Sequence, residues 1–108
     1  MKETFGEYIR KIRTEKELTL TQLAAKLDMD SANLSKVENG KRSFDEKRLT
    51  KLADFLELDI NKLKPEFYSD IIAKKFYKTS FYQETLSLAE QKIIYLRQKE
   101  AKQGTIKF

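Results

Sequence analysis

Residues 19–40 have the sequence TLTQLAAKLDMDSANLSKVENG, and this stretch decides the fold of the chain. Leu23 and Leu27 have the spacing of one helical turn, and so do Leu34 and Val37. Polar, turn-forming residues separate the two pairs. The stretch therefore predicts two short helices joined by a tight turn, with small polar side chains and a lysine on the outer face of the second helix.

The ends of both helices carry capping signals. Thr19 and Gln22 form a capping box, in which each side chain satisfies a free backbone amide. Asp30 is suited to N-cap the second helix. Asn39 and Gly40 are expected to end it, because glycine adopts the left-handed conformation that follows a helix end.

The rest of the first half also predicts helices. The whole chain has only three glycines and one proline, and its apolar residues recur at helical spacing. A first helix ends near Lys16, and a short turn at residues 60–63 follows the fourth helix. The apolar stripes of the first and fourth helices consist of Phe5, Ile9 and Ile12, and of Leu49, Leu52, Ala53 and Leu56.

A second region is predicted from Pro65 onward. Proline suits the first position of a helix, so we expect a new helix to begin there. After a break at residues 78–80, a last helix is expected from about Tyr82 to Lys102, ended by Gly104. We therefore expect a domain at residues 1–64 and a helical extension at residues 65–108. The apolar side of the helix after Pro65 consists of Phe67, Ile71, Ile72 and Phe76.

The composition limits the classes of function. The chain has 108 residues, a net charge of +5 and a pI near 9.3, which favours a polyanionic partner. It contains no cysteine and no histidine, which removes thiolate metal sites and the commonest general base. It also lacks an apolar run long enough to span a membrane and a signal peptide at its start. We expect a cytoplasmic protein that binds no membrane, no metal and no other cofactor.

Two carboxylate pairs allow metal binding or acid–base chemistry as an alternative. They are Asp28 with Asp30 and Asp45 with Glu46. Helix caps and solvated surface explain these pairs better, since aspartate is a preferred capping residue. We therefore expect no catalytic residue, no metal ligand and no enzyme activity.

The outer face of the second helix carries groups suited to bases. If Leu34 and Val37 point inward, the outward positions are Ser31, Ala32, Ser35 and Lys36. Lys36 can donate to guanine O6 or N7, and Ala32 can contact a thymine methyl group. Such a helix is typical of proteins that contact the major groove of DNA. The alternative for Lys36 is a solvated surface lysine.

From about Phe5 to Leu63 the chain resembles the Cro/phage-repressor type of helix-turn-helix protein, the XRE family. The resemblance implies an all-α, five-helix lambda-repressor-like DNA-binding domain with a C-terminal helical extension. The alternatives are a helical bundle that shares the pattern and the same fold used only for protein contacts. The matching segments are Ile9-Arg10-x-Ile12-Arg13, Leu18-Thr19, Leu23-Ala24, Leu34-Ser35-x-Val37-Glu38-Asn39-Gly40 and residues 49–58.

The resemblance implies roles for individual residues. Arg13 matches the arginine that pairs with the glutamate at the end of the third helix, here Glu38, and a bidentate pair would lock the two helices together. The base-facing positions of the family match Ser31, Ala32 and Lys36. The residues expected at the DNA backbone are Thr19, Thr21, Asn33, Asn39, Lys41 and Arg42. For the last two, the alternative is a charged loop.

Two residues depart from the family pattern. Leu20 stands where the family commonly has a glutamine that touches phosphate, so that contact is lost or is replaced by Thr19 or by the amides at the helix start. Asp28 stands where the family usually has glycine, and aspartate tolerates a positive φ better than most residues. Asp28 and Asp30 also place negative charge near DNA, which should weaken non-specific binding.

The last helix carries a seam of coiled-coil type, whose residues recur at 4-3-4-3 spacing. We expect this seam to form a homodimer, since helix-turn-helix proteins usually contact two half-sites about one helical turn apart. Packing within one chain is the alternative. The seam consists of Tyr82, Leu86, Ala89, Ile93 and Leu96.

Residues 88–97 are similar to a subset of short XRE-family regulators that often accompany restriction–modification or DNA methyltransferase genes. We therefore expect a dimeric transcriptional regulator on a palindromic operator in double-stranded DNA, acting by autoregulation or as a restriction–modification controller. The alternative is an antitoxin or adaptor whose C-terminal helices, with the tail at residues 105–108, bind a protein partner.

Overall fold

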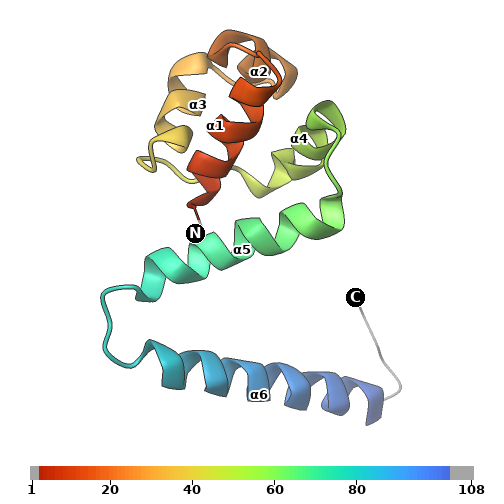
Figure 1. Cartoon of the computed structure of the whole chain (residues 1–108). Helices are drawn as coiled ribbons and strands as arrows, with labels where there is room; N and C mark the ends of the chain where they lie inside the picture. The colour runs from red at the N-terminus through yellow and green to blue at the C-terminus, as the bar shows by residue number, and fades with distance from the viewer. Residues whose placement is uncertain (1–2, 103–108) are drawn as a thin grey trace. The chain divides into compact units, whose positions relative to one another are not determined.

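The computed structural model describes residues 3–102, which form helices, turns and loops without a strand (Figure 1). The chain divides into two compact units after residue 72. The predicted all-α class is confirmed. The elements are α1 (Phe5–Glu15), α2 (Leu20–Lys26), α3 (Ser31–Glu38), the short 3₁₀ helix η1 (Glu46–Arg48), α4 (Leu49–Leu56), α5 (Ile60–Phe76) and α6 (Tyr82–Lys102).

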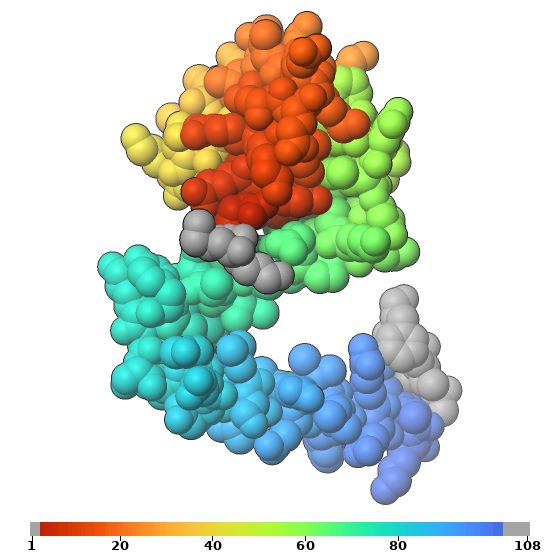
Figure 2. Space-filling model, viewed as in Figure 1, coloured from red at the N-terminus to blue at the C-terminus, as the bar shows by residue number. Residues whose placement is uncertain are grey.

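The core of the first unit lies between α1, α2, α3, α4 and the start of α5. Each predicted apolar stripe of the first four helices is buried there. Burial of one such side chain stabilises the fold by about 1.5–3 kcal/mol. In the space-filling view, side chains of α1, α3 and α4 close over this core (Figure 2). Its most deeply buried apolar residues are Ile9, Leu23, Leu27, Leu34, Leu52, Leu56 and Leu63.

The predicted caps of the helix-turn-helix are confirmed. The backbone N–H of Thr19 donates to Gln22 Oε1 at 2.8 Å, and the N–H of Gln22 donates to Thr19 Oγ1 at 3.1 Å. Asp30 N-caps α3, where its Oδ1 accepts from the N–H of Ala32 at 2.8 Å. Gly40 follows the end of α3 with a φ of 74°. Local sequence therefore sets the bounds of both helices.

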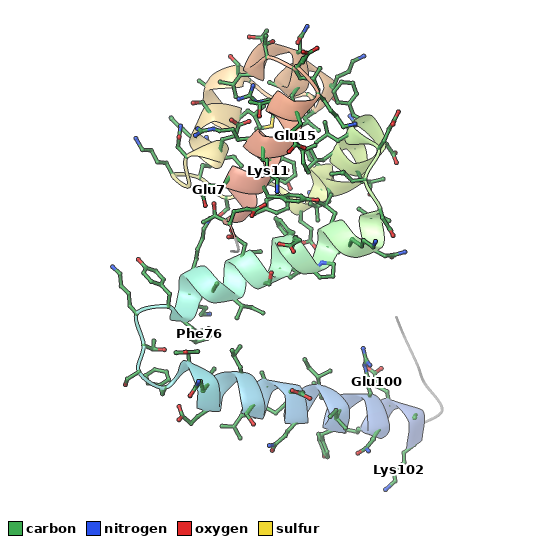
Figure 3. The ribbon with its side chains drawn as sticks, in the orientation of Figure 1. Glu7, Lys11, Glu15, Phe76, Glu100 and Lys102 are labelled. Carbon is green, nitrogen blue, oxygen red and sulfur yellow. The ribbon has the colours of Figure 1, made fainter. Side chains whose placement is uncertain are left out.

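A second capping box, which the sequence interpretation missed, begins α1. Glu7 Oε1 accepts from the N–H of Thr4 at 2.9 Å, and Thr4 Oγ1 accepts from the N–H of Glu7 at 3.2 Å. Glu7 thus lies in the first turn of α1, followed at four-residue spacing by Lys11 and Glu15 (Figure 3).

Arg48, which lies outside the turn between α2 and α3, holds this turn in place through two hydrogen bonds. Asp28 has a φ of 54°, the left-handed conformation for which the family usually has glycine at this position. Outside this turn, Glu17 and Glu57 also adopt a positive φ. Arg48 donates to the carbonyl oxygens of Leu27, at 2.8 Å, and of Asp28, at 3.0 Å. These bonds satisfy carbonyl groups that the end of α2 leaves without a helical partner.

The predicted helix start at Pro65 is wrong, because α5 runs continuously through that residue. A proline inside a helix costs about 3 kcal/mol. Leu63 and Phe67 lie one turn apart and are both buried in the first unit, and their burial offsets this cost. The first unit accordingly extends beyond the expected boundary at residue 64. Ile71 and Ile72, expected on the apolar side, are 46% and 43% exposed.

Within the second unit, the break at residues 78–80 and the helix from Tyr82 to Lys102 are confirmed. None of the described residues of α6 is buried. The helix end expected at Gly104 and the tail at residues 105–108 lie outside the described residues.

Candidate nucleic-acid interface

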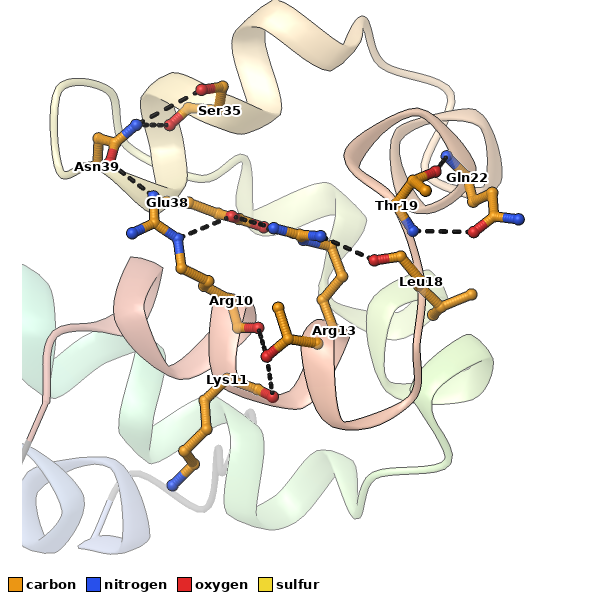
Figure 4. A network of polar contacts seen from close by, with 10 residues as sticks. Arg10, Lys11, Arg13, Leu18, Thr19, Gln22, Ser35, Glu38 and Asn39 are labelled. Carbon is orange, nitrogen blue, oxygen red and sulfur yellow. Dashed lines mark hydrogen bonds and ion pairs between the residues drawn. The ribbon is translucent and has the colours of Figure 1, made fainter.

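A buried carboxylate at the end of α3 connects this helix to α1. Glu38 is only 2% exposed, and the structure places Arg13 against it as the sequence predicted. The Nε atom of Arg13 donates to Glu38 Oε2 at 2.7 Å, and its Nη2 atom donates to Oε1 at 3.0 Å (Figure 4). The hydrogen bond that Arg13 donates to Glu38 raises the pKa of Arg13 above its ordinary value. The bidentate pair therefore holds α3 in a fixed register on α1.

The same guanidinium also reaches the segment that precedes α2. Arg13 Nη1 donates to the carbonyl oxygen of Leu18 at 2.7 Å. One side chain of α1 therefore contacts both the start and the end of the helix-turn-helix.

Arg10 is part of this network, and the sequence interpretation assigned it no contact. Its Nε atom donates to Glu38 Oε1 at 3.2 Å, and its Nη2 atom donates to Asn39 Oδ1 at 2.6 Å (Figure 4). Arg10 precedes Arg13 by three residues, and residues at that spacing share a helix face. The three-residue spacing from Arg13 was therefore the sequence signal that Arg10 could also reach the end of α3.

A close backbone approach supports the same junction. A Cβ atom added to Gly6 would lie 2.2 Å from the carbonyl oxygen of Val37 and 2.9 Å from that of Glu38. Only a residue without a side chain lets α1 lie this close to the end of α3.

The outer face of α3 is exposed where base contacts were predicted. Leu34 and Val37 are buried, so the opposite side of the helix faces outward. Ala32 and Lys36 are exposed, whereas Ser31 and Ser35 are half-buried. Within residues 3–102, no carboxylate forms an ion pair with Lys36. Its ammonium group is thus available to an external acceptor.

The structure brings several of the predicted backbone-contacting residues together. Arg42 Nη1 donates to Asn33 Oδ1, which joins the loop after α3 to the helix itself. The amide of Asn39 accepts from Arg10, and its Nδ2 donates to the carbonyl oxygen of Ser35 at 2.9 Å. The remaining members of this set, Thr19, Thr21 and Lys41, are exposed.

The two departures from the family pattern have clear structural roles. Leu20 is the first residue of α2 and is half-buried against the core, so an apolar contact stands in place of the usual glutamine. The carboxylate of Asp28 pairs with Lys51, and this hydrogen bond lowers the pKa of Asp28. Part of the negative charge near α3 is therefore balanced within the domain.

Each carboxylate of the two pairs weighed as a catalytic alternative is engaged in a contact within the domain. Asp30 caps α3, and Asp45 accepts from the N–H of Lys47 at 3.0 Å. Glu46 accepts a hydrogen bond from the hydroxyl of Tyr68, which raises the pKa of that tyrosine. These contacts favour capping over acid–base chemistry. Across the described range, no helix has the length and apolar character needed to cross a membrane.

Comparison with protein families gives one match that covers the interface. The helix-turn-helix family model HTH_3 matches residues 9–63, which include α2, α3 and the arginines that contact Glu38.

Individual relatives cover different shares of the chain. The HTH-type transcriptional repressor RghR of Bacillus subtilis is 40% identical over 57 residues, which are 52% of this chain and 42% of RghR. The match therefore spans less than half the length of that repressor. The control protein C.MunI of Mycoplasma sp is 35% identical over 72 residues, 66% of this chain and 92% of C.MunI. The ImmF control region 10 kDa protein of Bacillus phage phi105 is 39% identical over 59 residues, 55% of this chain and 66% of that protein.

A solved structure with a similar arrangement of helices also matches this chain. A chain of the SinR protein/SinI protein complex has a TM-score of 0.50 and 21% identity, over 87% of this chain and all of that chain. This likeness concerns the arrangement of helices.

Proposed function

The chain belongs to the helix-turn-helix family HTH_3, and on that premise we propose that it is a sequence-specific regulator of transcription that binds double-stranded DNA. The observation that carries the proposal is the placement of α3. Its end is held by Arg13 and Glu38, while its outer face presents Ala32 and Lys36 to solvent. A helix held in this way has the geometry needed to enter the major groove.

Specific binding then combines contacts to base edges with contacts to the phosphate backbone. The outer face of α3 contacts base edges, with Lys36 donating to guanine and Ala32 touching a thymine methyl group. Predicted backbone-contacting residues such as Thr19, Lys41 and Arg42 hold the domain in register on the phosphates. The net charge of +5 supports affinity for DNA, and that affinity should fall steeply with salt.

We propose further that the regulator is a homodimer formed through the α6 seam, and that it binds a palindromic operator. The seam includes Leu86, Ile93 and Leu96, which are 43%, 53% and 56% exposed in one chain. Side chains of this size are more often covered than left in water over a whole helix face. A two-fold dimer places two copies of α3 on half-sites about 34–36 Å apart.

The charges of α6 favour an antiparallel pair. An antiparallel arrangement lays the acidic half of each helix beside the basic half of the other, whereas a parallel arrangement brings the basic halves together. Ala89 lies at the centre of the seam, where a small side chain allows two helices to approach closely. The first half carries Glu84 and Glu90, and the second carries Lys92, Arg97, Lys99, Glu100 and Lys102.

The control-protein names of two relatives support a regulatory circuit in which the chain acts on its own promoter, as a restriction–modification controller or a similar regulator. The test is footprinting of the DNA directly upstream of the gene, at low and at physiological salt. We expect two protected half-sites about one helical turn apart. Absence of protection at both salt concentrations would contradict autoregulation.

The exposed apolar side chains of α6 also favour a second candidate function, as an antitoxin or adaptor that binds a protein partner. In that case the chain isolated from its own cells carries a stoichiometric partner, and Ile93→Glu releases it. A homodimer of the isolated chain that excludes such a partner would contradict this candidate.

A further inference from the structure

The contact between Arg42 and Asn33 fixes the direction of one amide group. Asn33 is the third residue of α3, and Arg42 lies in the loop that follows this helix. A guanidinium group only donates hydrogen bonds, so the oxygen of the Asn33 amide must face Arg42. The amide nitrogen, with its two donor hydrogens, therefore points away from Arg42.

The domain has a second arginine–asparagine pair, and it differs from the pair of Arg42 and Asn33 in the hydrogen bonds of the amide nitrogen. In the pair of Arg10 and Asn39, the asparagine nitrogen donates to the carbonyl oxygen of Ser35. By contrast, no group in the described part of the chain accepts a hydrogen bond from the nitrogen of Asn33. Asn39 is satisfied within the protein, whereas Asn33 keeps donors for an external acceptor.

We propose that Arg42 is a positioning residue that restricts Asn33 to donating, so that Asn33 selects guanine and rejects adenine at one base pair of the operator. The proposal rests on the proposed function and adds a specificity mechanism to it. An asparagine that recognises adenine donates to N7 and accepts from the N6 amino group through its amide oxygen, and in Asn33 this oxygen is turned toward Arg42. Guanine presents only acceptors, O6 and N7, at the same edge.

Asn33 lies near the N-terminal end of α3, the part of a recognition helix that contacts base edges. A phosphate oxygen also offers only an acceptor, so the test must separate a base contact from a backbone contact.

The test is selection of duplexes from a randomised DNA pool by the full chain. Asn33→Ala identifies the base pair that Asn33 contacts, as the position whose preference is lost. At that position we expect wild type to select guanine. Arg42→Met frees the amide oxygen and should raise selection of adenine relative to guanine by about tenfold, within the range of one good bidentate contact.

Lys41→Met is the matched control, because it removes one positive charge from the neighbouring residue, and Lys41 has no hydrogen bond to Asn33 among the described contacts. It should weaken binding to all sequences and leave base preference unchanged. In the Asn33→Ala background, Arg42→Met should likewise leave base preference unchanged.

Two results would overturn the roles proposed for Arg42 and Asn33 and leave the proposed DNA-binding function intact. If Arg42→Met behaves like Lys41→Met, Arg42 acts only as a cation for phosphate. If Asn33→Ala weakens binding without changing any base preference, Asn33 contacts the backbone. A wild-type chain that enriches no sequence contradicts the proposed function itself, and the three outcomes are distinguishable in one experiment.

Discussion

Arg13 of α1 donates to both carboxylate oxygens of Glu38 at the end of α3, at 2.7 and 3.0 Å. Glu38 is almost fully buried, so a lost partner would leave a charge away from water. Removing one member of such a pair typically costs about 3–5 kcal/mol. The position of α3 thus depends on a buried ion pair.

The first prediction concerns this pair. Arg13→Met should lower the free energy of unfolding by about 3–5 kcal/mol, measured by urea denaturation. Arg10→Met is the matched control, because Arg10 contacts the same carboxylate with a side chain that is 47% exposed. Its loss should cost about 1 kcal/mol or less. Equal losses for both variants would show that Arg13 has no special structural role.

The second prediction concerns two glycines that are needed for different reasons, Gly6 for a close backbone approach and Gly40 for a positive φ. Gly6→Ala should destabilise the domain by about 1–3 kcal/mol or more, because its Cβ would meet backbone that cannot move aside. Gly40→Ala meets no atom within 4 Å, and its cost comes only from the positive φ of 74°. Gly40→Asn should recover part of that loss, since asparagine tolerates this conformation. Thermal melts should show no such recovery for Gly6→Asn.

The helix-turn-helix could be predicted from sequence because its determinants are local. The capping box of Thr19 and Gln22 and the cap at Asp30 each depend on neighbouring residues, whereas the positive φ of Asp28 was expected from the family pattern. The pairing of Arg13 with Glu38 was predicted from a family resemblance, which supplied the long-range contact that spacing alone could not.

Sequence alone is misleading where tertiary packing outweighs local preference. Pro65 signals a helix start, yet α5 continues through it, because Leu63 and Phe67 are held in one core. The contacts of Arg10 with Asn39 and of Arg42 with Asn33 also escaped prediction. The spacing of Arg10 from Arg13 indicates the shared helix face, but long polar side chains on exposed surfaces have many rotamers, and sequence does not select the one that contacts a given partner.

The third prediction tests the outer face of α3. Lys36→Ala should cost about 1–3 kcal/mol of binding free energy and relax specificity at one base pair. Lys41→Ala should instead weaken binding to all sequences and reduce the slope of log affinity against log salt by about 1. Titration of labelled duplexes at several salt concentrations measures both effects. Unchanged site preference in Lys36→Ala would mean that this lysine does not face a base.

The fourth prediction tests the α6 seam. Ile93→Glu places a carboxylate in the proposed dimer contact and should convert the dimer to a monomer in light scattering after size exclusion. Gln91→Glu adds the same charge to the same exposed helix outside the seam, and it should leave the dimer intact. A chain that is monomeric before any substitution would contradict the dimer proposal, as would equal effects of the two variants.

The fifth prediction concerns acid stability. The hydrogen bond from the backbone of Thr4 lowers the pKa of Glu7 from its ordinary value of 4.5. A carboxylate with a lowered pKa stabilises the folded state above the unfolded pKa, and this contribution is lost as pH falls through the folded value.

Glu7→Gln should therefore reduce the difference in urea midpoint between about pH 7 and about pH 3. Glutamine keeps the capping box, as Gln22 does at the start of α2, so the variant should remain folded. The same pH dependence in both proteins would assign the acid sensitivity to other carboxylates.

Glu17, Asp28 and Glu57 hold left-handed backbone conformations without being glycine. Each carries a conformational cost of about 1–2 kcal/mol relative to an unstrained residue. Substitution of these three exposed residues by glycine would therefore remove this cost and leave the core and α3 unchanged. That gain in stability would offset the cost of substitutions on the outer face of α3, so the proposed DNA preference can change while the fold persists.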